Sequence, residues 1–177
     1  GRECDQAGHS GVARRPDGSF VAVWRGVGPG SVQGVWLRRY DAGGTPQGVE
    51  TLIAVGGQNP SVAINSLAGG FVIAWNFHNG TDYDVRAQRF DAVGNPLGGV
   101  LDVNTSTSGD QFFPVVASDV DGDFVVLFAG EGQGDSYGIL GQLYDPSGSP
   151  VGGEFWVNAT VTNEQFSQLQ SAFLLAY

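Results

Sequence analysis

The sequence predicts an all-β, propeller-like fold made of three and a half four-stranded blades. Three observations favour it. Glutamine anchors recur at intervals of 52, 53 and 54 residues, at Gln6, Gln58, Gln111 and Gln165. Between them lie short runs rich in Val, Ile and aromatic residues, bounded by Gly, Pro, Asn and Asp, which is typical of strands and turns. No stretch keeps a 3.6-residue apolar period, so we expect essentially no helix.

Each repeat contains four strands in the same order. In the second repeat they lie at 61–63, 71–75, 85–90 and 100–104, separated by Gly-rich turns and one longer polar loop. The 71–75 strand, FVIAW, is apolar at successive positions, which predicts burial on both faces of its sheet. A propeller blade packed between two neighbours needs such a strand. A linear stacked array of β repeats is the alternative architecture.

The turn DxxGxP joins the third and fourth strands and begins at Asp41, Asp91 and Asp145. An aspartate can cap its own turn through its carboxylate, and the glycine three residues later suits a left-handed backbone conformation. This turn therefore predicts a hairpin at the same place in every blade.

The domain organisation follows from the repeat. We expect one repeat domain over 1–177, with units at about 6–57, 58–110 and 111–164 and a partial unit at 165–177. The turn expected between Ala172 and Phe173 is missing, and the absence of Met predicts a fragment or a processed product. Three and a half blades leave an apolar face and strand edges open, so we expect the ring to be completed by a second copy or by further repeats.

The composition excludes some classes of binding partner. The net charge is −10 and Lys is absent, so the chain is expected to repel nucleic acid and anionic membrane surfaces. No apolar run approaches the roughly twenty residues of a membrane-spanning helix. Cys4 is the only cysteine, which rules out an internal disulfide.

Four motifs together carry a family resemblance: QNPSVA at 58–63, FVIAW at 71–75, AQRFD at 87–91 and FWVN at 155–158. They resemble the tandem repeats, of propeller-blade type, found in very large bacterial secreted, adhesin-like proteins. Those repeats often accompany cadherin-like domains and hemolysin-type calcium-binding repeats. The resemblance spans nearly the whole chain, with the first unit the most divergent. It implies an extracellular or cell-surface location and an adhesive or matrix-forming role, and it supplies no catalytic residues.

One acidic turn is a candidate calcium site. Asp119, Asp121 and Asp123 place carboxylates at alternating positions around a glycine, as the start of a calcium loop does. The corresponding turns of the other units lack these acids, and the glutamate that ends an EF-hand loop is missing. A plain hairpin turn with solvated carboxylates is the alternative. We expect no other cofactor.

The loops after the second strands are candidate ligand sites. They combine aromatic rings with amides and carboxylates, a combination suited to stacking on a sugar and bonding its hydroxyls. Variable polar loops without a ligand are the alternative interpretation. The candidate residues are His78, Asn79, Asp82, Tyr83, Asp84, Asp135 and Tyr137.

Arg38, Arg86 and Arg89 lie in third strands, where we expect their stems to pack between blades and their guanidinium groups to pair with aspartates. The two histidines, His9 and His78, have no matching catalytic partners, and no nucleophile or phosphate-binding motif occurs. The sequence thus favours an extracellular, non-catalytic module for adhesion or structural self-assembly, associating with itself or with neighbouring repeats. A carbohydrate-binding propeller is the alternative, and a glycoside-acting enzyme is less favoured.

Overall fold

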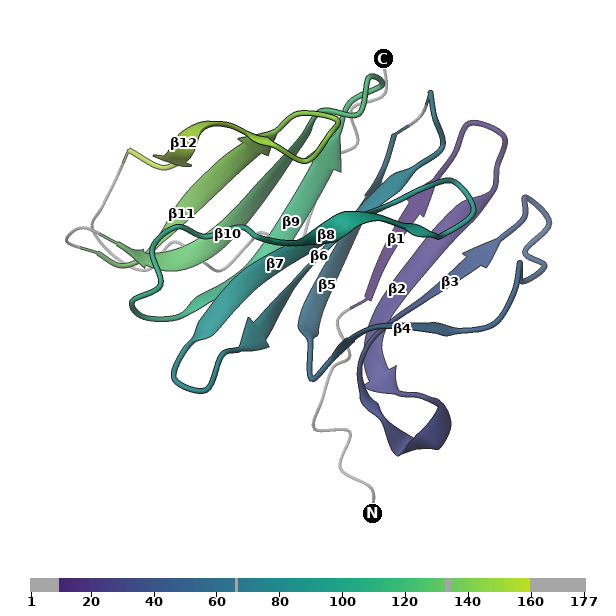
Figure 1. Ribbon diagram of the computed structural model, residues 1–177, viewed down its shortest axis with the longest axis horizontal. Helices are drawn as coiled ribbons and strands as arrows, with labels where there is room; N and C mark the ends of the chain where they lie inside the picture. Colours follow the sequence, from purple (N-terminus) through teal and green to yellow (C-terminus); the bar gives the residue numbers. More distant parts are fainter. Residues whose placement is uncertain (1–9, 66, 133–134, 160–177) are drawn as a thin grey trace.

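The computed structural model describes residues 10–65, 67–132 and 135–159. In these ranges the chain forms three four-stranded antiparallel sheets and one short 3-10 turn, η1 (Pro29–Ser31) (Figure 1). The predicted all-β class is confirmed. No helix in the described ranges is long and apolar enough to cross a membrane. The partial unit predicted at 165–177, with its missing turn, lies outside them.

Each sheet is an up-and-down meander formed by one repeat, with its strands paired in sequence order. Blade one comprises β1 (Ser10–Arg14), β2 (Phe20–Val27), β3 (Gln33–Tyr40) and β4 (Thr51–Val55). Blade two comprises β5 (Gln58–Ile64), β6 (Phe71–His78), β7 (Tyr83–Phe90) and β8 (Pro96–Asp102). Blade three comprises β9 (Gln111–Ser118), β10 (Phe124–Gly132), β11 (Asp135–Tyr144) and β12 (Pro150–Trp156).

The three blades are arranged as a fan. The first strands, β1, β5 and β9, lie next to one another, and β5 and β9 each also contact the second and third strands of the preceding blade. Among the described residues, every extensive contact between blades involves β5 or β9, and none joins two fourth strands. The sheets therefore converge on their first strands and diverge toward β4, β8 and β12 (Figure 1). This is the arrangement of propeller blades, and the three blades formed by residues 10–159 do not close into a ring.

Every blade has two different apolar faces, because side chains alternate along a strand. We call the face toward the preceding blade the upstream face and the other the downstream face. In blade two the upstream face carries Phe71, Ile73 and Trp75, which pack with Val21 and Val23 of blade one. An aromatic face thus meets an aliphatic face at the first junction.

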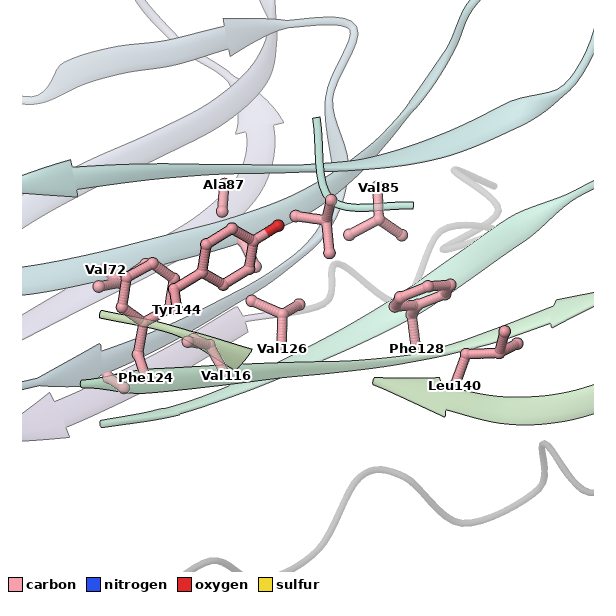
Figure 2. Packing of buried hydrophobic residues seen from close by; sticks show 12 residues of the cluster. Val72, Val85, Ala87, Val116, Phe124, Val126, Phe128, Leu140 and Tyr144 are labelled. Carbon is pink, nitrogen blue, oxygen red and sulfur yellow. The ribbon is translucent and has the colours of Figure 1, made fainter. Parts of the chain in front are cut away.

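The second junction repeats this packing. The downstream side chains Val72 and Val85 of blade two face Phe124, Val126 and Phe128 of blade three (Figure 2). As a result β6 is buried on both sides, as the sequence predicted: the exposed fractions are 2, 6, 0, 0 and 2% along 71–75.

A stacked ring pair joins the second and third strands on each upstream face. The ring centroids are 5.0 Å apart in the Phe71–Phe90 pair and 4.8 Å apart in the pair of Phe124 with Tyr144. Both pairs are buried under the preceding blade. The corresponding pair of blade one, Phe20 with Tyr40, is stacked at 4.7 Å but only half-buried.

The predicted aspartate turns are confirmed in all three blades. Asp91 Oδ1 accepts the backbone N–H groups of Val93 at 3.0 Å and Asn95 at 2.8 Å, and Asp41 and Asp145 do the same in their turns. Gly94 follows with φ +90°, a conformation that side chains other than glycine rarely adopt. The bond from the Asn95 N–H is the main reason that the pKa of Asp91 lies below its usual value.

Candidate functional site

The meander places the predicted site residues on two opposite rims. Alternate connections of an antiparallel meander lie at the same end of the sheet. The β6–β7 loop, with candidates from His78 to Asp84, therefore lies on one rim, which we call the loop rim. The β9–β10 turn, with candidates from Asp119 to Asp123, lies on the other, the turn rim. The structure does not bring these two candidate sites together.

Asn79 organises the β6–β7 loop. Its Oδ1 accepts the backbone N–H groups of Thr81 at 2.8 Å and Asp82 at 2.9 Å. Its Nδ2 donates to Asp84 Oδ2 at 2.7 Å. The side chain therefore closes the loop and fixes one carboxylate at its base, as asparagine does in turns elsewhere.

Below the loop a buried amide network joins blades two and three. Asn104 Nδ2 donates to Asp84 Oδ1 at 2.8 Å and to Gln111 Oε1 at 3.1 Å, while Asn104 Oδ1 accepts the Val85 N–H at 2.8 Å. Gln111 is 1% exposed and Asn104 is 7% exposed. Both carboxylate oxygens of Asp84 accept amide hydrogens, so this group is held rigidly as an acceptor.

Sequence reasoning did not include Asn104 or Gln111 in the candidate ligand cluster. Two signals pointed to them: Gln111 is one of the recurring glutamines, and Asn104 ends the fourth-strand motif VLDVN as Asn158 ends the motif EFWVN in the next unit. In blade three, Asn158 Oδ1 accepts the Ile139 N–H at 2.8 Å, the equivalent of the bond from Val85. The repeat of this contact marks it as part of the blade architecture.

The loop also presents two aromatic rings. His78 and Tyr83 meet edge to face with centroids 5.0 Å apart, and His78 is exposed. The Tyr83 hydroxyl accepts a hydrogen bond from Gln58 Nε2 at 3.2 Å, and the Tyr83 N–H donates to Asp110 Oδ1 at 3.0 Å. Asp82 is half-buried beside them. Rings fixed beside amide and carboxylate groups can stack on an apolar ring face and bond its polar edge.

The remaining loop candidates are Asp135 and Tyr137. Asp135 is the first residue of β11, and its backbone pairs with Gly132. The side chains of Asp135 and Tyr137 lie outside the described residues, so their place in a site stays a prediction.

The acidic turn has the geometry of a capped hairpin. Asp119 Oδ1 accepts the backbone N–H groups of Asp121 at 3.0 Å and Gly122 at 2.9 Å, and the Asp119 N–H donates to the Asp123 carbonyl at 3.0 Å. Across residues 10–65, 67–132 and 135–159, no three His, Cys, Asp or Glu side chains converge closely enough to hold a metal ion. These hydrogen bonds explain the conformation of the turn without a metal ion. Calcium binding there stays a prediction.

The turn rim holds a groove of about 460 Å³ between blades one and two. Arg15 lines it and donates from Nη2 to the carbonyls of Gly69 at 2.6 Å and Ala92 at 3.2 Å. Partial burial lowers the pKa of this guanidinium from its usual value. Arg15 therefore links the two blades, and its donors are directed at the Gly69 and Ala92 carbonyls and at the Ser19 hydroxyl.

Two third-strand arginines have different partners, one within its own blade and one in the next blade. Arg86 meets the aspartate-pairing part of the expectation, with its Nε 2.9 Å from Asp102 Oδ1, and its guanidinium carbon lies 3.6 Å from the centre of the Phe77 ring in the same blade. Arg89 differs, because its Nη1 donates to the Pro146 carbonyl in the next blade rather than to an aspartate. The sequence could not show this, because the acceptor is a backbone atom of another repeat.

No protein-family model matches the chain, and no curated protein matches it. Among solved structures, the chain is similar to the Hadza microbial sialidase Hz136, with a TM-score of 0.57 and 12% identity over 80% of this chain and 35% of that one. This likeness supports the propeller-like fold.

An endo-arabinase from Bacteroides thetaiotaomicron aligns with a TM-score of 0.49 and 16% identity, over 81% of this chain and 59% of that one. The chain spans about a third of the length of the sialidase and about three fifths of that of the endo-arabinase.

Proposed function

We propose that this chain is an extracellular, non-catalytic repeat module that serves adhesion or structural self-assembly. The blade junction carries this proposal. The same packing of an aromatic upstream face on an aliphatic downstream face is built twice, from residues at matching repeat positions. Repeats that bury their faces only against one another gain stability by stacking, and a surface with that design suits assembly. The location follows from the resemblance to secreted adhesin-like repeats.

The loop-rim carboxylates support a non-catalytic role. A glycosidase needs two carboxylates facing one bond, one of them able to give up or take a proton. Each Asp84 oxygen accepts an amide hydrogen, from Asn79 or from Asn104, and Asp110 Oδ1 accepts the Tyr83 N–H. These groups hold loops in place.

Homotypic adhesion tests the proposal. Beads coated with the protein should cluster with one another, and sedimentation velocity should show a mass that rises with protein concentration. Beads coated with an unrelated acidic protein of similar charge serve as the control. Dispersed beads, a constant monomer mass and cleavage of glycosidic substrates would together reject the proposal.

Carbohydrate binding on the loop rim is the second candidate. The observation that favours it is the exposed His78 ring held edge to face against Tyr83 beside the amide of Asn79. A glycan array should then give signals that His78→Ala abolishes. Leu67→Ala, at an exposed position in the β5–β6 turn on the other rim, should keep them. Equal signals from the two variants, or none from the wild type, would reject this candidate.

Calcium at the acidic turn is tested separately. Isothermal titration with calcium should give binding heat that Asp121→Asn removes, since carboxylate oxygens are the ligands a calcium ion prefers. A titration of the wild type without heat would eliminate the site.

A further inference from the structure

The β6–β7 loop contains the only Asn-Gly pair of the sequence, Asn79-Gly80. An asparagine side chain loses its amide nitrogen when the backbone nitrogen of the next residue attacks its Cγ and closes a five-membered ring. Glycine permits this attack most readily, because it has no side chain to crowd the attacking nitrogen. A Cβ built on Gly80 would meet no atom within 4 Å, and both residues are exposed, so water can reach the ring.

A histidine lies against the attacking nitrogen. The Gly80 N–H donates to His78 Nδ1 at 3.2 Å, so this ring nitrogen is the acceptor and the proton of the neutral imidazole lies on Nε2. The Gly80 nitrogen must lose its proton to become a nucleophile, and an imidazole within hydrogen-bond reach is the commonest general base. The Tyr83 ring meets the His78 ring edge to face and helps to hold it in this position.

The Asn79 amide is held at both ends. Its Oδ1 accepts the N–H groups of Thr81 at 2.8 Å and Asp82 at 2.9 Å, which folds the side chain toward the backbone that follows it. The same two donors stabilise the negative charge that an attack on Cγ places on Oδ1. At the other end Nδ2, the leaving group, donates to Asp84 Oδ2 at 2.7 Å. A base, two oxyanion donors and a fixed leaving group therefore surround one carbon.

Asn65 provides a comparison within the chain. Its Oδ1 also accepts the N–H groups two and three residues later, those of Leu67 and Ala68, both at 2.9 Å. Ser66 follows it instead of glycine, and His78 lies on the opposite rim. The β5–β6 turn thus has the same cap as the β6–β7 loop, without the glycine nucleophile and without His78.

From these contacts we propose that Asn79-Gly80 is a self-modification site, at which the loop converts the Asn79 amide into a carboxylate. His78 takes the proton of the Gly80 N–H, and the Gly80 nitrogen forms a bond to Asn79 Cγ. The bond from Cγ to Nδ2 breaks, and the proton held by His78 passes to Nδ2, which leaves as ammonia. Water then opens the ring at either carbonyl and leaves an aspartyl or an isoaspartyl residue. One amide and one water give one carboxylic acid and one ammonia, without oxidation or reduction.

The modification removes the contact that ties the loop to Asp84. Neither product has the amide hydrogen that Asn79 donates to Asp84 Oδ2, and each places a second carboxylate beside the first. Like charges at this separation repel each other. Asp84 keeps the hydrogen bond from Asn104, so the amide network between blades two and three remains. The site is therefore a slow, irreversible switch of the loop, and it does not depend on whether the chain self-assembles.

Peptide mass spectrometry of the folded protein at neutral pH tests the site. Conversion of Asn79 should be at least tenfold faster in the folded protein than in the same chain unfolded in guanidinium chloride, because only the fold places the base and the oxyanion donors. Asn65 should stay unmodified over the same time. In water enriched in heavy oxygen, each product should gain one heavy oxygen atom. Equal or faster conversion in the unfolded chain would overturn the proposal.

Two substitutions isolate the role of His78. His78→Ala and His78→Phe should each slow the conversion by about tenfold, less than the full gain from a general base, because hydroxide from the solvent still acts. His78→Phe keeps a ring against Tyr83, so an equal loss in the two variants assigns the effect to the ring nitrogen. Imidazole in the buffer should accelerate His78→Ala by a larger factor than the wild type. Leu67→Ala, at an exposed position on the other rim, should convert like the wild type. Wild-type rates in both histidine variants would contradict the assigned base.

Asn79→Asp tests the effect on the loop. Hydrogen exchange of the backbone amides of 79–83 should be about tenfold faster than in the wild type, the factor expected for the loss of one hydrogen bond to a charged group. The amides of β6 and β7 outside the loop serve as the internal reference and should not change. Exchange at the wild-type rate throughout would rule out the switch and leave the self-modification standing.

Discussion

Replacing the same repeat position in two blades tests the blade packing. Phe128 is fully buried at the junction of blades two and three, whereas Trp24, its counterpart on the upstream face of blade one, is half-buried. Phe128→Ala should lower the free energy of unfolding by about 4 kcal/mol, the usual loss for a buried aromatic residue. Trp24→Ala should lower it by about 1 kcal/mol, because much of that side chain already contacts water.

The expected shifts can be measured in urea. With a denaturant slope of about 2 kcal/mol/M, a loss of about 4 kcal/mol moves the unfolding midpoint down by about 2 M, against about 0.5 M for Trp24→Ala. In thermal unfolding the corresponding shifts are about 12 °C and about 3 °C. The protein concentration should be low enough to keep the chain monomeric, so that association does not add to the stability of the Trp24 position.

Two results would contradict the predicted difference between Phe128→Ala and Trp24→Ala. Equal losses at the two positions would mean that the upstream face of blade one is buried as deeply as the internal junctions. Loss of less than 1 kcal/mol at both would mean that the blades do not pack through these faces at all. Because repeat proteins can unfold unit by unit, fluorescence and circular dichroism should be recorded together to detect separate unfolding of blade three.

Further predictions concern the aspartate turns, the buried Tyr144 and the bond from Arg89 to the next blade. Hydrogen bonds lower the pKa of Asp41, Asp91 and Asp145, so their stabilisation is present above the unfolded pKa near 3.9 and is lost as the pH falls through the folded values. The triple Asp→Asn variant keeps an acceptor in each turn and should flatten the acid limb of a thermal-stability profile; an unchanged limb contradicts this. Burial raises the pKa of Tyr144 to about 12, so its stabilisation is complete below pH 10 and lost as the pH rises through the folded value. Tyrosinate absorbance should report this ionisation together with unfolding, and Tyr144→Phe should unfold at higher pH than the wild type. Arg89→Ala should cost about 1 kcal/mol in urea unfolding, and no change would show that the bond to Pro146 contributes nothing.

The fold could be predicted because its signals are local and repeated. The run from Phe71 to Trp75 is apolar at every position, and its short length and flanking glycines and polar residues favour a strand covered on both sides. The Asp91 turn depends on bonds between residues two and four apart, which the motif itself specifies. Such features need no knowledge of the neighbouring blade.

The parts that the sequence did not reveal depend on contacts between repeats. Asn104 meets Gln111 only because the fourth strand of blade two ends beside the start of blade three. Arg89 was expected to find an aspartate, but its position on the downstream face directs it to the Pro146 carbonyl. In the candidate site the missing information lies within one repeat, in contacts that no local motif specifies. Asp84 looked like a ligand group in the sequence, and its two amide partners show that it also anchors the loop.

Distances between spin labels test the fan of blades most directly. One pair joins the first strands of blades one and three, at Arg14 and Ser118, and the other joins their fourth strands, at Thr51 and Phe155. Sheets that converge on their first strands predict a clearly longer distance for the Thr51–Phe155 pair than for the Arg14–Ser118 pair. Sheets stacked as parallel layers would give both pairs the same separation, about twice the ~10 Å sheet spacing, and that result would contradict the propeller-like arrangement.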